Sequence, residues 1–245
     1  MKTKLYKTSF LLFLVGTMGL TSCYFDFEDD DFGCVRGRGS QISEARFITN
    51  FTSVTNATSA NVVIVQGTTY EVEVRAQDNL LDEVSTKVRG NELLIDTRRC
   101  INNADIDIFI TMPQINGLSI IGSGDIFGDN TWQVNDLDLK VIGSGDMDLD
   151  VDADDIDIEI RGSGEITLFG TADDCRTDIT GSGDLRSFNL VADDHRVTIF
   201  GSGNAQVFAS DQLDVTISGS GDVLYKGSPF ISVNISGSGD LVDAN

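Results

Sequence analysis

The side chains best suited to chemistry in this sequence recur at one position behind a repeated turn. Seven times the chain reads Gly-Ser-Gly, and the residues that follow are Asp125, Asp146, Glu165, Asp184, Asn204, Asp222 and Asp240. Carboxylate oxygens are the ligands that Ca²⁺ takes in proteins, so this column could bind a ladder of calcium ions. Alternatively, each side chain could accept a hydrogen bond from its own turn. Because Asn204 interrupts the column, the sequence favours the structural role.

A second set of ionisable side chains precedes the turns. One column contains Asp138, Asp157, Arg176, Arg196 and Asp214, and its neighbour contains Lys140, Glu159, Asp178, Thr198 and Thr216. β-Helical enzymes that cleave polysaccharides place carboxylates and Arg on such a face, and Glu159 would lie ~5 Å from Asp178 on adjacent coils. Every pair of stacked coils has that spacing, so the distance does not identify a catalytic pair. We expect salt bridges there instead, such as Asp157 with Arg176.

Cys175 and His195 form a third candidate, since both stand six residues before a turn on consecutive repeats. A Cys beside a His could be a nucleophile pair or half of a metal site. Both are expected to point toward the core, however, and the sequence contains no other His. We expect a buried thiol and a buried, hydrogen-bonded imidazole. No phosphate-binding loop, dinucleotide fingerprint or cysteine zinc pair occurs, so the sequence predicts no catalytic residue and no cofactor.

A repeat of 18 to 21 residues must position these side chains. Its turns begin at Gly122, Gly143, Gly162, Gly181, Gly201, Gly219 and Gly237. Apolar residues alternate with polar ones ahead of each turn, as in Leu137, Leu139 and Val141, and this period of two predicts a strand with one buried face. Polar "ADD" returns follow at 153–155, 172–174 and 192–194. Stacked units then bury one core, which predicts an all-β, right-handed, single-stranded parallel β-helix of about seven coils.

Residues 41–112 lack the turn signature but keep strand patterns such as "YEVEVRA" at 70–76. We expect irregular early coils and a cap, because an uncovered first coil would expose its backbone edge. The stretches "FTSVTNATSANVVIVQGTTYEVEVRAQDNLLDEV", "LLIDT" and "ITMPQINGLSIIGSGDI" resemble the family called putative auto-transporter adhesin, head GIN domain, over about residues 41–245. The resemblance implies one β-helical domain on exported, often lipidated bacterial proteins. It implies no catalytic residues.

The N-terminus is typical of an exported lipoprotein. Residues 1–22 combine a basic start with an apolar run, and the small residues ahead of Cys23 resemble a lipobox, so we expect cleavage before Cys23 and its lipidation. Residues 23–40 form an acidic tether, either a solvated spacer or an export tag for the outer face of the outer membrane. Without the signal, the chain contains 14 Lys and Arg and 39 Asp and Glu. The resulting net charge of −25 disfavours nucleic acid as a partner.

Three cysteines remain once Cys23 is assigned to the lipid anchor. Cys175 lies on an alternating strand with its side chain inward, so it is expected to be a small buried thiol. In an oxidising compartment this leaves a disulfide between Cys34 and Cys100, which would join the N-terminal arm to the domain.

Taken together, these patterns favour a non-enzymatic lipoprotein of the outer membrane, facing the periplasm or the cell surface. Its long repetitive faces would bind a glycan or a protein, as an adhesin or a structural module. A carbohydrate-active enzyme, either a polysaccharide lyase or a hydrolase, is the alternative. Self-association is a third hypothesis, because the last coil, ending in "GDLVDAN", has little sequence left to cap it.

Overall fold

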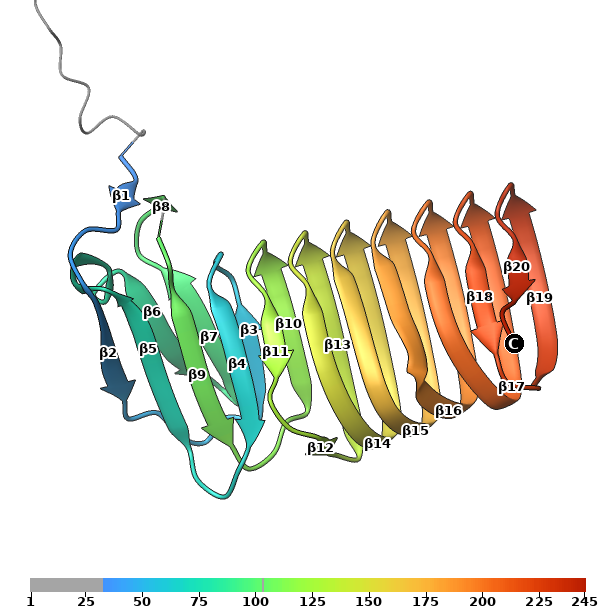
Figure 1. Cartoon of the computed structure of the whole chain (residues 1–245), viewed down its shortest axis with the longest axis horizontal. Helices are drawn as coiled ribbons and strands as arrows, with labels where there is room; N and C mark the ends of the chain where they lie inside the picture. Colours follow the sequence, from blue (N-terminus) through green and yellow to red (C-terminus); the bar gives the residue numbers. More distant parts are fainter. Residues whose placement is uncertain (1–32, 103) are drawn as a thin grey trace, which may run out of the picture. The chain divides into compact units, whose positions relative to one another are not determined.

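The repeat builds a parallel β-solenoid, as the sequence predicts (Figure 1). The structure is a computed structural model that describes residues 33–102 and 104–245. The predicted export signal, Cys23 and the acidic run at 26–31 lie outside the described residues. Because the described chain from residue 33 on belongs to one unit with one hydrophobic core, the solenoid and its N-terminal part form a single domain.

The strands that precede the turns form one long row of parallel strands. They are β10 (Gly117–Gly122), β13 (Asp136–Gly143), the later halves of β14 (Met147–Gly162), β15 (Glu165–Gly181), β16 (Asp184–Gly201) and β17 (Ala205–Gly219), and β19 (Phe230–Gly237). Their register aligns the first glycine of each turn with that of the next. Equivalent side chains therefore stack in columns along the solenoid.

A second parallel row consists of the strands that follow the turns. It contains β11 (Ile126–Gly128), the early halves of β14 to β17, β18 (Val223–Lys226) and β20 (Leu241–Asp243), while the short β12 (Trp132–Gln133) pairs with β14. The "ADD" segments were predicted as returns between strands, but β14, β15 and β16 run through them unbroken. Their alanines, Ala153, Ala172 and Ala192, are buried, and two successive exposed Asp residues mark each bend.

The N-terminal part begins with one coil that has no Gly-Ser-Gly turn. Its strands are β3 (Ser53–Asn56) and β4 (Asn61–Gln66), which pair in parallel with β10 and β11. The buried Asn56 shapes this turn, because its Oδ1 accepts hydrogen bonds from the backbone N–H and the hydroxyl of Thr58 at 3.1 and 2.7 Å. Side-chain hydrogen bonds thus replace the glycines of the later turns.

Antiparallel strands complete this end of the domain, where the sequence predicted irregular coils and a cap. The strands β7 (Glu92–Thr97) and β9 (Asp107–Met112) are still parallel to β3 and β4. Beyond them, β6 (Val84–Arg89) pairs antiparallel with β7, β5 (Glu71–Gln77) with β9, and β2 (Gln41–Arg46) with β5. The only helical turn among the described residues is η1 (Asp78–Leu80), and no helix there is long and apolar enough to cross a membrane.

The inward rows of Leu, Ile and Val form the core, and the last coil is the exception. Leu213, Val215 and Ile217 are at most 2% exposed, whereas their register partners Ile231, Val233 and Ile235 are 43, 51 and 39% exposed. The prediction of a buried face on the last strand was therefore wrong. The alternation sets the direction of these side chains, but no further coil covers them in the part of the chain that the structure describes.

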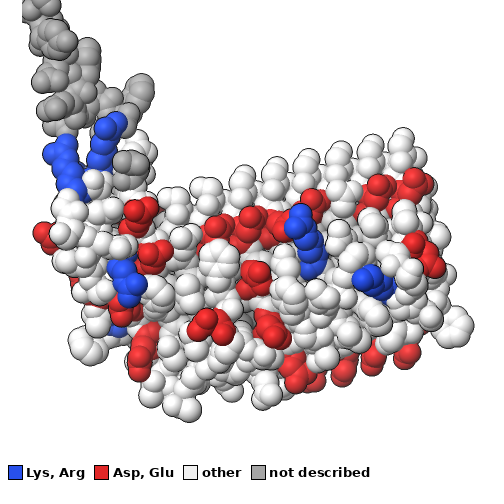
Figure 2. Space-filling view, in the orientation of Figure 1, with Lys and Arg blue, Asp and Glu red and all other residues white. Residues whose placement is uncertain are grey.

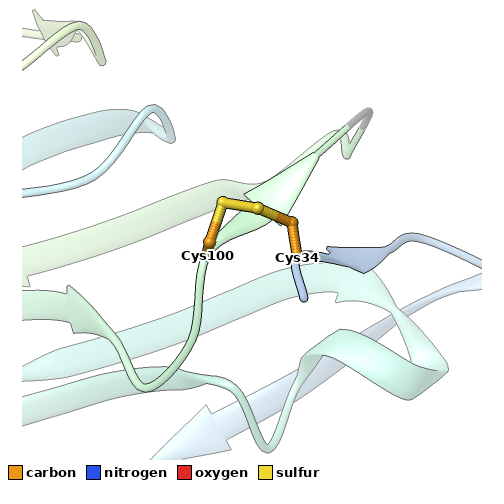
Figure 3. Close-up of a disulfide and its surroundings, with 2 residues drawn as sticks. All are labelled: Cys34 and Cys100. Carbon is orange, nitrogen blue, oxygen red and sulfur yellow. A yellow bond between two sulfur atoms is a disulfide. The ribbon is translucent and has the colours of Figure 1, made fainter. Parts of the chain in front are cut away.

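Cys34 and Cys100, the two cysteines expected to pair, are joined by a disulfide with a Cα–Cα distance of 4.5 Å (Figure 3). The bond stands beside a small two-stranded sheet of β1 (Val35–Arg36) and β8 (Ile101–Asn102). It fixes residues 34–36, which fall within the predicted tether of residues 23–40, to the N-terminal end of the solenoid. Cys175 is a free, buried thiol.

Candidate functional site

The Gly-Ser-Gly turns stack on one another through their backbones. The Ser144 N–H donates to the carbonyl of Gly122 at 2.9 Å, and the same hydrogen bond recurs at every later turn. At this separation there is no room for side chains on the glycines: a Cβ on Gly201 would lie 2.2 Å from the Gly181 oxygen, and one on Gly203 would lie 2.1 Å from the Gly183 oxygen. The first glycine also has a positive φ, +134° in Gly201. The glycines of the turn therefore serve geometry rather than chemistry.

The acidic column behind the turns forms a ladder of hydrogen bonds between coils. The Asp146 N–H donates to Oδ1 of Asp125 at 2.8 Å, and the Glu165 N–H donates to Oδ1 of Asp146 at 2.9 Å. The same bond joins Asp184 to Asn204, Asn204 to Asp222, and Asp222 to Asp240. These five side chains accept from the next coil rather than from their own turns, which was the alternative that the sequence suggested. An amide oxygen does this as well as a carboxylate, so Asn204 does not interrupt the ladder.

Between Glu165 and Asp184 the ladder lacks this side-chain hydrogen bond. The Asp184 N–H donates instead to the backbone carbonyl of Gly164 at 3.1 Å, while Oε2 of Glu165 forms an ion pair with Arg186 at 2.9 Å. The additional methylene of Glu carries its carboxylate past the backbone of the next coil. Among the described residues no group of three or more His, Cys, Asp or Glu is arranged to hold a metal ion. The geometry of the column therefore supports coil stacking.

The predicted columns ahead of the turns are aligned as expected, Glu159 opposite Asp178 and Asp157 opposite Arg176. Glu159 forms ion pairs with Lys140 and Arg161, and the hydrogen bond from Lys140 lowers the pKa of its carboxyl. Arg176 pairs with Asp178 at 3.1 Å on its own strand, so the predicted pairing with Asp157 was wrong. A carboxylate held ionised between two cations is a poor general acid, and these contacts favour a salt-bridged surface over a catalytic pair.

An open groove of about 310 Å³ lies where the bends meet the pre-turn strands. It spans five consecutive coils, β13 to β17, and its ionisable lining residues are Asp136, Asp138, Asp155, Asp157, Asp174, Asp194, Asp214, Arg176 and Arg196, with His195 and Cys175 behind them. Desolvation by the neighbouring coils, together with the nearby Asp194 and Asp155, raises the pKa of the exposed Asp174 carboxyl. Seven carboxylates against two guanidinium groups give the groove a negative potential.

One column of this groove was not recognised from the sequence. Asp136, Asp155 and Asp174 are register partners, Asp194 follows Asp174, and each stands seven residues before the first glycine of a turn. The signal was present, because the second Asp of every "ADD" segment falls at this offset. It was missed because these residues were assigned to returns rather than to strands.

His195 and Cys175 are stacked in register inside the core, and both are nearly inaccessible to solvent. Burial lowers the pKa of His195 to about 4 and raises the pKa of the Cys175 thiol to about 12. Nε2 of His195 lies 3.1 Å from the hydroxyl of the buried Thr177. A nucleophile pair requires a thiolate and an imidazolium, and this environment favours the opposite protonation state of both groups.

Comparison with known protein families places most of the chain in one of them. Residues 50–229 match the family described as putative auto-transporter adhesin, head GIN domain. The chain belongs to this family. None of the curated proteins matches the sequence. Family membership identifies the β-solenoid as an adhesin-like or binding module of a surface or exported protein, although it identifies no partner.

Solved structures resemble the chain over most of its length. The crystal structure titled a putative adhesin from Bacteroides fragilis has 25% identity and a TM-score of 0.81, and it covers 85% of this chain and 99% of its own. A structure titled a putative lipid binding protein from Parabacteroides distasonis has 25% identity, the same coverages and a TM-score of 0.73. A putative adhesin from Parabacteroides merdae, at 19% identity and a TM-score of 0.68 with coverages of 85% and 99%, shares the fold.

Proposed function

We propose that this protein is an adhesin-like lipoprotein of the outer membrane that binds a glycan or a protein along the acidic groove. The observation that supports the proposal is the groove itself, which runs across five stacked coils. Four intervals of ~4.8 Å give it a length of roughly 19 Å, enough for a few sugar rings or an extended peptide. A repeating row of hydrogen-bonding side chains suits a ligand that repeats along its length.

The charges of the groove restrict the ligand. Its excess of Asp over Arg repels polyanions and favours neutral or cationic groups, since like charges raise the energy of the complex. Sugar hydroxyls can donate to the carboxylates, and Lys or Arg side chains of a protein can pair with them. One related structure is titled a putative lipid binding protein, but anionic headgroups are a poor match for this charge.

A polysaccharide-cleaving enzyme is less well supported. The candidate pair Glu159 and Asp178 is engaged by Lys140, Arg161 and Arg176. The carboxylates of the groove repeat from coil to coil at exposed positions, and the half-buried Asp214 is paired with Arg196. Acid–base catalysis needs two carboxyl groups with different environments. The repeated arrangement is more suitable for binding than for cleavage.

Anchoring through Cys23 is the part of the proposal that rests on the sequence alone. A lipid on this residue would place the domain at the membrane without a spanning segment. In the full chain, Cys23→Ser should move the protein from the membrane fraction to the soluble fraction of the producing cell. Retention in the membrane fraction would contradict the lipid anchor.

The ligand is tested with residues 24–245, whose described part contains the whole core and the disulfide. Arrays of glycans and matrix proteins should return at least one ligand. The double variant Asp155→Asn, Asp174→Asn should lose at least ten-fold in affinity for it. Asp148→Asn with Asp150→Asn is the matched control, because it removes the same charge from exposed positions on the other strand row. If both variants bind equally, the groove is not the binding surface; if nothing binds, the proposed function fails.

A further inference from the structure

The last coil leaves an apolar row and a strand edge uncovered. Five of the large exposed apolar side chains lie on this coil: Phe230, Ile231, Val233, Ile235 and Val242. Phe230 is 86% exposed, and its strand β19 pairs through one edge with β17. In the described chain no strand pairs with the other edge of β19. Unpaired N–H and C=O groups beside apolar side chains form a template for another strand.

The usual protections of an edge strand are absent from β19. Its ladder with β17 runs over eight residues without a register shift, and residues 230–237 contain neither a charge nor a proline. The edge strands at the other end of the solenoid are different. There β2 carries Glu44 and Arg46, and β6 carries Lys87 and Arg89. Charged edge strands discourage pairing, so the solenoid is protected at one end and available at the other.

The charge pattern points to a second copy of the chain as the occupant. The chain has a net charge of −22, so two copies repel each other across most of their surfaces. Residues 228–239, "SPFISVNISGSG", carry no charged side chain, and the charged side chains of the last coil, Asp240 and Asp243, lie behind its turn and on β20. Two copies can therefore approach most closely along β19, where each offers the other apolar area that is already exposed.

The sequence of β19 is also complementary to itself. If two copies of the strand pair antiparallel about Val233, then Ile231 lies opposite Ile235 of the other copy and Ser232 lies opposite Asn234. In these central pairs apolar side chains meet apolar ones and polar side chains meet polar ones, as an isologous two-fold interface requires, while the outermost pair places Phe230 opposite Ser236. Stacking this end on the charged end of another copy would instead place Ile231 and Val233 against charged strands and would continue into a filament.

From this edge, its neutrality and its self-complementary register, we propose that the protein forms a two-fold dimer through its last coil. In the dimer β19 of each copy pairs antiparallel with β19 of the other, and the two apolar rows become one continuous core. The interface closes, so association stops at two copies. The proposal does not depend on the ligand of the groove.

The mass of residues 24–245 in solution tests this proposal. At micromolar concentrations, light scattering should give twice the chain mass, and Val233→Lys should give the monomer mass with an unchanged circular dichroism spectrum. Val191→Lys is the matched control, because Val191 is 43% exposed on the side of the solenoid, and it should remain dimeric. A wild-type monomer, an open-ended oligomer, or a dimer that survives Val233→Lys would overturn the proposal.

The register is tested by cross-linking. In an antiparallel pair, directly opposed residues have Cα atoms about 4.5 to 5.5 Å apart, within the range of a disulfide. Val233→Cys should therefore form an intermolecular disulfide under mild oxidation. Ser232→Cys should not, because its partner is Asn234. Equal cross-linking of the two variants, or none at residue 233, would contradict the proposed pairing.

Discussion

His195 occupies a core position where the next coil carries Leu213 and the preceding one carries Cys175. Its burial makes the neutral imidazole the stable form, and the Thr177 hydroxyl supplies a partner for Nε2 without any charge. The chemistry available to this cluster is therefore limited to packing and hydrogen bonding. Its ionisation should appear in the stability of the fold rather than in an activity.

The stability of the protein should fall as the pH is lowered through the range in which only unfolded His195 is protonated. The pKa of this residue is about 4 in the folded state, against 6.5 for the ordinary side chain. Between these values the unfolded state binds the additional proton, so the free energy of unfolding decreases from pH 6.5 toward pH 4, by up to about 3 kcal/mol. Above pH 6.5 the residue contributes no pH dependence.

Urea denaturation of wild type and His195→Leu across this pH range would measure the effect. Leu occupies the same register position on the next coil, at Leu213, and it removes the titration. The carboxylates titrate in both proteins, so the difference between the two curves isolates His195. Parallel pH profiles would show that the imidazole is not held neutral.

The ladder behind the turns predicts that its side chains are needed as acceptors, not as charges. Asp146→Ala leaves the Glu165 N–H without its acceptor and should lower the free energy of unfolding by about 1 kcal/mol. Asp146→Asn should change it by less than about 0.5 kcal/mol, because Asn204 already performs this role in the wild type. Thermal denaturation with and without millimolar Ca²⁺ is the control, and a shift in the midpoint would favour the calcium hypothesis.

On the scale of a coil, the repeated turn determines how closely the strands can stack. Gly201→Ala would place a methyl group 2.2 Å from the Gly181 carbonyl in a backbone region that only glycine adopts readily. We expect a loss of about 3 kcal/mol or more from backbone strain and overpacking. Gly90→Ala is the control, since Gly90 also has a positive φ but no atom within 4 Å of the added Cβ; it should cost about 1 kcal/mol. Chemical denaturation compares the two, and equal losses would contradict this account.

The elements that could be predicted from the sequence are those that the coil repeat determines. The period of the turn and the alternation of Leu137, Leu139 and Val141 predicted the coils, because both depend only on neighbours in the sequence and on stacking of like on like. Apolar and polar residues alternate in β5 just as they do in its neighbour β9. The alternation therefore could not predict that β5 runs antiparallel to β9. The acceptor role of Asp146 depends on the distance to the next coil, and the exposure of Val233 depends on whether a coil follows. Neither is encoded in the local pattern.

The candidate groove was predicted only in part for a related reason. Asp138, Asp157, Arg176, Arg196 and Asp214 were assigned to one outward column, and they line the groove in register. The wall formed by the second Asp of each "ADD" segment appears only when the bend is itself part of the strand. Concavity arises from how the chain bends, so the composition of the groove could be predicted but its shape could not.

For the molecule as a whole, the negative charge is spread over the long, continuous surfaces that the stacked coils form. On the face shown in Figure 2, Asp and Glu outnumber Lys and Arg. The net charge of −22 favours solubility but works against compaction, and the coils offset this repulsion with a core that runs through the whole domain. The disulfide adds a constraint of a different kind, because it acts mainly on the unfolded chain.

Loss of the disulfide should therefore lower the stability without altering the solenoid. The bond closes a loop with a sequence separation of 66, for which loop-closure entropy corresponds to about 4 kcal/mol. The small sheet of β1 and β8 beside it is separate from the sheet that holds the coils. Cys34→Ser with Cys100→Ser should accordingly keep the native circular dichroism spectrum while its urea midpoint falls, and reduced wild type should behave alike. An unchanged midpoint would show that the arm is held by contacts rather than by the bond, and a lost spectrum would show that the cap must form before the coils can stack.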